Sequence, residues 1–303
     1  SLRRRQRQMC IRDSNRTGKI GDIKNTGAIN GSGKTSGAST GYGIHNDKDY
    51  GKEIGNITNE GVISGSGTST GGNGEGYGIY NGATMGAIEN TGLISGAGYN
   101  NNTSNGISDT GSGIHNNSSD KQMGKITNIG IINGYGSSVG ERSSSGTGYG
   151  INNESGTIGD ITNIGVISGT GYGIANATIT SDVGEIEVIT NTGIIYGKDN
   201  AIKNDADATI GTSNNYGILA NGKNEKEVVN GTINENKGLI FKAVGGTYKA
   251  EEKDYEKFGK TYVDENIVID YQKDDTGKPD LNNPITKKYT IINATALGND
   301  RDD

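Results

Sequence analysis

The sequence predicts an all-β fold, a right-handed parallel β-helix solenoid of about eight coils. The first observation is an internal repeat, I-G-x-I-x-N-x-G-x-I-x-G-x-G followed by a variable insert and G-Y-G-I-x-N, whose shortest clean copy is residues 158–176. The second is the phasing of the isoleucines, which is kept although only 30% of the chain is hydrophobic and the mean hydropathy is −0.64. So polar a composition is typical of disorder, but a disordered chain has no reason to keep isoleucines in phase. The third is the 53 glycines, each of which would cost a helix about 1 kcal/mol, so helical solenoids are excluded.

Residues 1–14 do not belong to the repeats. They hold the only cysteine, Cys10, and five arginines: Arg3, Arg4, Arg5, Arg7 and Arg12. An arginine run can bind nucleic acid or a membrane, but this string reads as translated adapter sequence joined to an incomplete gene. We therefore exclude it from the fold prediction.

The rest of the chain is acidic. Without residues 1–14, Lys and Arg fall from 29 to 24 and Asp and Glu from 35 to 34, so the net charge moves from −6 to −10. An acidic surface repels phosphate backbones, so nucleic acid is not an expected partner. The remaining sequence has no cysteine, which excludes a disulfide scaffold and a Cys-ligated metal.

Residues 15–245 form the predicted repeat array. In the first half of each unit an asparagine recurs at one position, where stacked amides can form a ladder along the axis: Asn25, Asn59, Asn90, Asn128, Asn163, Asn191 and Asn215. Neighbouring coils are expected about 4.8 Å apart. Stacked isoleucines fill the core, and each buried side chain contributes about 1.5–3 kcal/mol. The glycine two residues after each asparagine is expected to supply a positive φ at the corner.

The second half-unit carries a row of tyrosines. Stacking is expected among Tyr42, Tyr77, Tyr149 and Tyr172, with Ser112 interrupting the row. The flanking glycines leave both directions open for these rings, into the core or out of it.

The two histidines, His45 and His115, occupy the x of G-x-G-I-x-N, with Tyr80 at that position in the coil between them. They are expected about 9–10 Å apart, too far for one metal ion, whose ligand nitrogens lie near 2 Å from it. We interpret both as solvated side chains on an outward row and predict no metal site.

Later copies of the repeat drift. A three-residue insertion is predicted after Ile186, Ser213 stands where an isoleucine is expected, and the copy around Asn236 is one residue out of step. Residues 246–303 are less regular and hold both prolines. They are interpreted as a cap over the open end of the solenoid or as the start of further coils, with strands predicted at 266–271 and 289–294.

Three patterns that suggest chemistry are better explained by the repeat. GAINGSGKT at 27–35 lacks the first glycine of a phosphate-binding loop, and its Lys34 and Thr35 correspond to Thr68 and Ser69 of the next copy. GGNGEG at 71–76 lacks the aspartate of calcium-binding nonapeptides. A polysaccharide-cleaving site needs clustered carboxylates. Asp160 and Glu185 are possible neighbours, but like charges on a solvated face are the commoner case. We predict no catalytic residues and no cofactor.

The repeats resemble passenger-domain repeats of type V autotransporter adhesins, particularly the Gly-, Asn- and Ile-rich surface proteins of fusobacteria. The resemblance covers roughly residues 18–245 and rests on I-G-D-I-x-N-x-G-x-I-S-G-x-G and G-Y-G-I-x-N. It implies export through a C-terminal outer-membrane β-barrel and display of the passenger outside the cell. Neither a barrel nor an export signal is visible, so the resemblance implies a fragment.

Two functions are consistent with these observations. The first is an extracellular adhesive stalk, not an enzyme, whose inserts attach to a host-cell or bacterial surface protein or glycan. The alternative is a secreted carbohydrate-active β-helix enzyme, a polysaccharide lyase or hydrolase, and a third option is a spacer with no binding of its own. A transmembrane helix is not expected, because there is no run of about 18 apolar residues.

Overall fold

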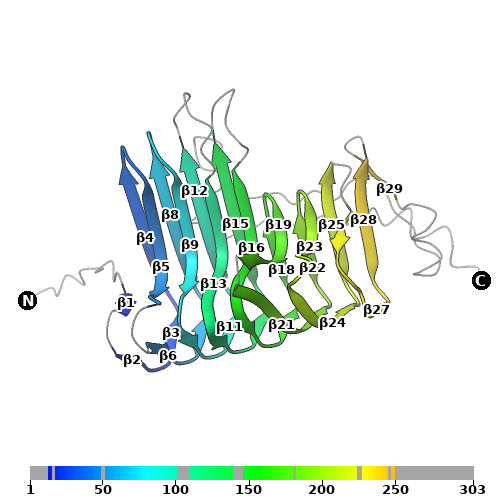
Figure 1. Cartoon of the computed structure of the whole chain (residues 1–303), viewed down its shortest axis with the longest axis horizontal. Coiled ribbons are helices and arrows are strands. Elements are labelled where there is room, and N and C mark those ends of the chain that lie inside the picture. Colours follow the sequence, from blue (N-terminus) through cyan, green and yellow to red (C-terminus); the bar gives the residue numbers. More distant parts are fainter. Residues whose placement is uncertain are drawn as a thin grey trace, which may run out of the picture.

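The computed structural model is a parallel β-helix solenoid, so the predicted fold class is confirmed (Figure 1). It describes residues 13–15, 18–48, 52–100, 109–138, 146–179, 182–223, 227–244 and 247–249. Every regular element in these ranges is a β-strand. The strands form two sheets that run the length of the solenoid, a first sheet of 20 strands and a second sheet of nine.

The first sheet supplies several strands to each coil. Its strands are β1 (Asp13–Asn15), β2 (Lys19–Ile20), β3 (Ile23–Asn25), β5 (Ser39–Asn46), β6 (Glu53–Ile54), β7 (Ile57–Asn59), β9 (Gly74–Asn81), β10 (Thr84–Met85), β11 (Ile88–Asn90), β13 (Thr110–Met123), β14 (Ile126–Asn128), β16 (Thr147–Ile158), β17 (Ile161–Asn163), β19 (Tyr172–Asn176), β20 (Thr178–Ile179), β21 (Asp182–Asn191), β23 (Asn200–Asn204), β24 (Thr209–Asn215), β26 (Val229–Asn230) and β27 (Glu235–Asn236).

The second sheet supplies one strand to each coil. Its strands are β4 (Ala28–Thr35), β8 (Val62–Ser69), β12 (Leu93–Asn100), β15 (Ile131–Ser138), β18 (Val166–Gly169), β22 (Ile194–Gly197), β25 (Ile218–Lys223), β28 (Leu239–Val244) and β29 (Thr247–Lys249). Within this sheet the strands follow chain order, and only β28 and β29 pair antiparallel.

Equivalent repeat positions pair across neighbouring coils. Asn25 lies opposite Asn59, and Ile29 lies opposite Ile63. Because a one-residue slip would turn every inward side chain outward, this register keeps all copies of the motif facing the same way. Each sequence repeat is therefore one coil.

The core consists of columns of stacked isoleucines. One column follows the G-Y-G-I-x-N motif, and all of its members are at most 2% exposed: Ile44, Ile79, Ile114, Ile151, Ile174 and Ile202. A second column ends where Ser213 lies opposite Ile189. Ser213 is 2% exposed and its Oγ has no hydrogen-bond partner, so this substitution removes apolar contact and leaves a buried hydroxyl unsatisfied.

The glycine of the N-x-G corner does not have the predicted positive φ. Among the described glycines, positive φ occurs only at Gly18, Gly156 and Gly231, none of which is in such a corner. The physical reason for glycine is close stacking. A Cβ on Gly61 would lie against the carbonyl oxygen of Gly27 in the preceding coil.

Gly61→Ala is expected to lower the free energy of unfolding by about 2 kcal/mol, because the stacked corners must move apart. The matched control is Gly27→Ala at the first corner, where an added Cβ has nothing within 4 Å, so the expected loss is under about 0.5 kcal/mol. Urea denaturation measures both changes. Equal losses would contradict the stacking explanation.

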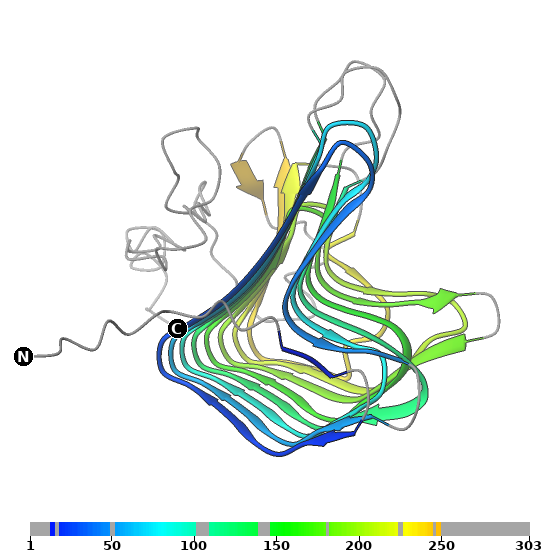
Figure 2. The same ribbon diagram turned by 90° about the vertical axis from the view of Figure 1, so that its left-hand side faces the viewer.

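The two sheets pack backbone to backbone over part of each coil. Figure 2 shows them running side by side toward the turns that join β4 to β5 and β8 to β9. A Cβ on Gly65 of β8 would fall on the carbonyl oxygen of Tyr77 in β9, and one on Gly76 of β9 would fall on that of Ala97 in β12. The alternating glycines of both half-units therefore face each other, and the residues between them point outward. This leaves no room for side chains between the sheets.

The later copies are more regular than predicted. Ile186 pairs with Ile158 and Ile189 pairs with Ile161, so the predicted insertion after Ile186 is wrong. The additional residues precede this copy, where β20 pairs antiparallel with β21. Asn236 pairs with Asn215, so the shifted last copy still joins the array.

Both predicted boundaries lie near the ends of the described chain. The strand β1 spans the predicted boundary between Ser14 and Asn15 and pairs in parallel with β5. At the other end, β29 turns back along β28 and is the only described part of residues 246–303. The strands predicted at 266–271 and 289–294 lie outside the described residues.

Candidate functional site

The predicted asparagines lie inside the solenoid at the N-x-G corner. From Asn25 to Asn215, each Nδ2 donates to Oδ1 of the next member at 2.8 Å, and Asn236 extends the row at 2.7 Å. Each amide also binds backbone. Asn128, for example, donates to the carbonyl oxygens of Gly130 and Val166. These side chains satisfy buried polar groups, so they belong to the scaffold and not to a binding surface.

A second amide ladder was not predicted. It consists of the asparagines that end G-Y-G-I-x-N, again linked at 2.8 Å: Asn46, Asn81, Asn116, Asn153, Asn176 and Asn204. The sequence carries the same signal for this row as for the first, because the asparagine recurs in copy after copy. Recurrence of asparagine at one position of the repeat is therefore enough to predict an amide ladder.

The G-Y-G-I-x-N motif makes a corner that is concave on its outer side. Gly43 and Ile44 both face inward, since a Cβ on Gly43 would contact Ile63 and Ile44 is 1% exposed. Two successive inward residues break the alternation of the strand, so Tyr42 and His45 both point outward. Residues three apart in a strand span about 10 Å, yet the Tyr42 and His45 ring centroids are 4.1 Å apart and the rings are stacked. The side chains therefore converge.

The tyrosines form an outward row on one side of this corner. Tyr42 stacks on Tyr77 with ring centroids 5.5 Å apart, and Tyr149 stacks on Tyr172 at 5.4 Å. Ser112 pairs with both Tyr77 and Tyr149, so it interrupts the row as predicted. It is completely buried, and its Oγ has no hydrogen-bond partner.

A second outward row runs along the other side of the corner. In register its members are His45, Tyr80, His115, Asn152, Ala175 and Lys203. The histidines are two coils apart, as predicted, but the prediction that both are solvated is wrong for His115, which is 3% exposed. Its ring centroid lies 4.9 Å from those of Tyr77 and Tyr80, because the bend directs the two rows toward each other.

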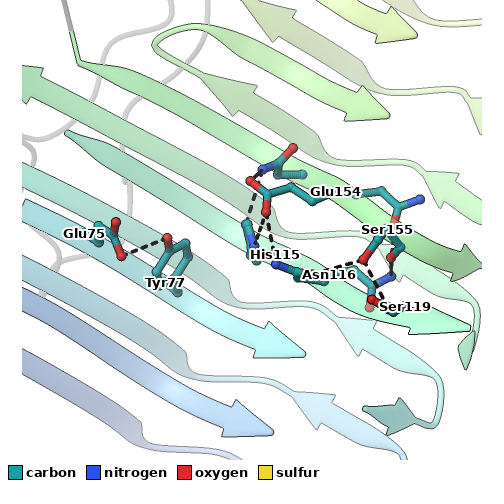
Figure 3. Close-up of polar contacts among 10 residues, drawn as sticks. Glu75, Tyr77, His115, Asn116, Ser119, Glu154 and Ser155 are labelled. Carbon is teal, nitrogen blue, oxygen red and sulfur yellow. Dashed lines mark hydrogen bonds and ion pairs between the residues drawn. The ribbon is translucent and has the colours of Figure 1, made fainter. Parts of the chain in front are cut away.

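A β-bulge turns Glu154 onto this second row (Figure 3). Asn116 pairs with Asn153 and Asn117 pairs with Ser155, so Glu154 has no partner in the neighbouring strand. Such bulges re-aim a side chain. Here the Glu154 carboxylate lies 3.3 Å from His115 Nε2.

Asn152 completes the contacts of this carboxylate. Its Nδ2 donates to Glu154 Oε1 at 3.2 Å and lies 3.3 Å from His115 Nδ1. With Nδ1 as acceptor, His115 Nε2 carries the proton and donates to Glu154. Burial by itself would raise the pKa of Glu154, but the hydrogen bonds from His115 and Asn152 counter burial, and the pKa of Glu154 lies below its usual value.

Carboxylates surround the tyrosine rows. Burial, followed by the charges of Glu75 and Glu154, raises the pKa of Tyr77, whose hydroxyl donates to Glu75 at 3.3 Å. Burial also raises the pKa of Tyr80 to about 12. The pKa of Tyr149 is raised by burial, then by Tyr172, Glu154, Asp205 and Asp199. We call the two outward rows together with Glu75, Glu154 and Asp205 the tyrosine face.

One ammonium group of the chain already lies on the tyrosine face. Lys203 Nζ is 5.3 Å from the centroid of the Tyr172 ring and 2.9 Å from Asp205 Oδ1. The ring face and the carboxylate both attract a cation. The tyrosine face can therefore hold an ammonium group between a tyrosine ring and a carboxylate.

The other sequence motifs do not come together into a site. Lys34 and Thr35 pair with Thr68 and Ser69 in extended β4 and β8, so residues 27–35 are not a phosphate-binding loop. Asp160 and Glu185 are not opposite each other, because Glu185 pairs with Thr157. In the described part of the chain, no group of three or more His, Cys, Asp and Glu side chains could hold a metal ion.

Asp109 is a buried carboxyl group at the start of β13. It is fully buried, its Oδ1 accepts from Gly74 N–H at 2.8 Å, and its Oδ2 has no hydrogen-bond partner. Burial raises the pKa of Asp109 from 3.8 to about 6, against the opposing effect of the Gly74 hydrogen bond.

Asp109→Asn is expected to make the protein less sensitive to pH. The folded state holds the Asp109 proton more tightly than the unfolded state, so the stability contributed by the protonated group is complete below about pH 4 and is lost as pH rises through about 6. The native protein should lose up to about 3 kcal/mol across this window relative to the variant. Urea denaturation at several pH values gives the difference. Parallel pH profiles would contradict the assignment.

Comparison with models of protein families, with curated proteins and with solved structures finds no match. The described residues contain no helix with the length and apolarity that crossing a membrane requires.

Proposed function

We propose that this chain is an extracellular adhesive rod, displayed on a bacterial surface in the manner of an autotransporter passenger. One observation carries the proposal. Positions that face inward hold isoleucine, asparagine and glycine in coil after coil, whereas one outward row changes from His45 to Tyr80, His115, Asn152, Ala175 and Lys203. Within this row His45, Tyr80 and Lys203 are partly exposed, and the three residues between Tyr80 and Lys203 are buried against their neighbours. A rigid repeated scaffold with a varied outer surface is typical of repeat proteins that bind partners along their length.

The tyrosine face supports binding better than catalysis. His115 does not act on a nucleophile, because Asn152 occupies its Nδ1 side, Glu154 occupies Nε2, and Ser112 Oγ has no hydrogen-bond partner. Tyrosine rings, in contrast, supply large contact areas at low entropic cost and are enriched where proteins bind each other.

Adhesion of coated beads tests the proposal. Beads carrying the purified full chain are presented to epithelial cells, extracellular-matrix proteins and other bacteria, with albumin-coated beads and beads carrying heat-unfolded chain as controls. Attachment that depends on the folded chain is the expected result. Attachment no higher than that of the albumin beads on every surface would overturn the proposal. Release of new sugar ends from glycans incubated with the chain would favour the carbohydrate-active enzyme instead.

A further inference from the structure

We propose that the tyrosine face binds a basic segment of a protein partner, with a lysine or arginine side chain taking the place of Lys203 over Tyr172. This inference rests on the adhesive function proposed above and deepens it by naming the chemistry of the partner.

The position of Lys203 gives the geometry of such a cation. Lys203 pairs in register with Ala175, which lies in the same coil as Tyr172. Because the Ala175 side chain ends at Cβ, Lys203 Nζ can lie over the Tyr172 ring at 5.3 Å while it pairs with Asp205. The Lys203 and Asp205 side chains are each 31% exposed. Both groups therefore reach the surface, so a partner's cation can approach Tyr172 and Asp205 from solvent and exchange with Lys203.

The surroundings of Tyr149 extend this position into a site. Tyr149 stacks on Tyr172, and the carboxylates of Glu154, Asp205 and Asp199 all act on its hydroxyl. A cation at the position of Lys203 therefore meets the Tyr172 ring and the Asp205 carboxylate. The charges of Glu154 and Asp199 act on the neighbouring Tyr149, and this arrangement favours lysine and arginine over neutral groups.

Charge also decides between possible partners. The carboxylates would repel the phosphates of a nucleic acid and the sulfates of an acidic glycan. A neutral glycan would gain nothing from replacing Lys203. A basic protein segment gains from both the rings and the carboxylates, so it is the occupant that the residues favour.

The experiment measures binding of a fluorescent peptide of alternating lysine and glycine to the full chain by anisotropy. We expect saturable binding that weakens as salt is added, and no binding of the same peptide with acetylated lysines. Lys203→Ala is expected to tighten binding about three- to tenfold, because it removes the competing cation, and Tyr172→Leu to weaken it by a similar factor.

Lys237→Ala is the matched control. Lys237 also lies over a tyrosine, with Nζ 5.8 Å from the Tyr216 ring centroid, and pairs with Glu235. It belongs to the N-x-G corner and not to the tyrosine face, and its removal changes the net charge by the same amount as Lys203→Ala. We expect peptide affinity to change less than twofold. Circular dichroism of each variant verifies that it is folded.

Three results would overturn the inference. These are equal gains for Lys203→Ala and Lys237→Ala, which would show that the tyrosine face has no preference for the peptide over the N-x-G corner; no gain for Lys203→Ala; or equal binding of the acetylated peptide. The bead assay separates this inference from the proposed function. Beads that adhere although the peptide does not bind leave adhesion standing and reject the basic partner, whereas peptide binding without adhesion rejects the adhesive role.

Discussion

Replacing Asn128 with alanine is expected to lower the free energy of unfolding by about 4 kcal/mol. In the native chain Asn128 Oδ1 accepts from Asn90, and Asn128 Nδ2 donates to Asn163 and to two carbonyl oxygens. Alanine removes the donor to the buried Asn163 Oδ1 and one of the acceptors of Asn90 Nδ2. It also opens a cavity at a position where the native side chain is 0% exposed. Both effects add to the loss. Equilibrium urea denaturation measures it.

The control for Asn128→Ala is its neighbour Ile129. This side chain is 48% exposed. Ile129→Ala should therefore change the free energy of unfolding by under about 0.5 kcal/mol, although it removes as many side-chain heavy atoms as Asn128→Ala. A loss for Asn128→Ala as small as that for Ile129→Ala would show that the amide ladder contributes nothing to stability.

Gly65→Ala is expected to destabilise the solenoid by about 3 kcal/mol. The added Cβ would coincide with the backbone oxygens of Tyr77 and Gly41, from two different coils. Neither neighbour is the movable end of a side chain, so the two sheets must separate. That separation would also weaken the packing of the coils on either side.

Ser66→Ala provides the comparison for Gly65→Ala. Ser66 is the next residue in β8, faces outward and is partly exposed, so its replacement should have an effect under about 0.5 kcal/mol. Denaturation midpoints of the two variants differ strongly if the glycines hold the sheets together. Similar midpoints would mean that the sheets are not packed backbone to backbone.

The fold could be predicted because its signal is periodic. Isoleucine and asparagine recur at fixed positions, and the register follows from aligning the copies, as the pairing of Asn163 with Asn191 shows. The same reasoning placed the histidines two coils apart and the tyrosines in a row interrupted by Ser112. Alignment of copies predicts which residues are neighbours along the axis.

The tyrosine face could not be predicted because it depends on departures from periodicity. The sequence does not reveal that Gly43 and Ile44 both face inward, and this bend is what brings Tyr42 against His45 and buries His115. Nor does it reveal that Glu154 is the extra residue of a bulge, since the choice between Glu154 and its neighbours depends on local backbone geometry. The prediction of a positive φ at the glycine of the N-x-G corner is wrong for a similar reason. The need for glycine there comes from the close approach of the neighbouring coil, which the local sequence does not show.

The register of the coils underlies every contact described above, and paired cysteines test it most directly. Thr58 pairs with Glu89, and Glu89 pairs with Thr127 one coil further on. In a background with Cys10→Ser, the pair Thr58→Cys and Glu89→Cys should form a disulfide under mild oxidation, because paired residues lie about 4.8 Å apart, within the range that a disulfide spans. The pair Thr58→Cys and Thr127→Cys lies about 10 Å apart and should stay reduced. Equal cross-linking of the two pairs, or cross-linking of the second pair only, would contradict the solenoid register and the tyrosine face built on it.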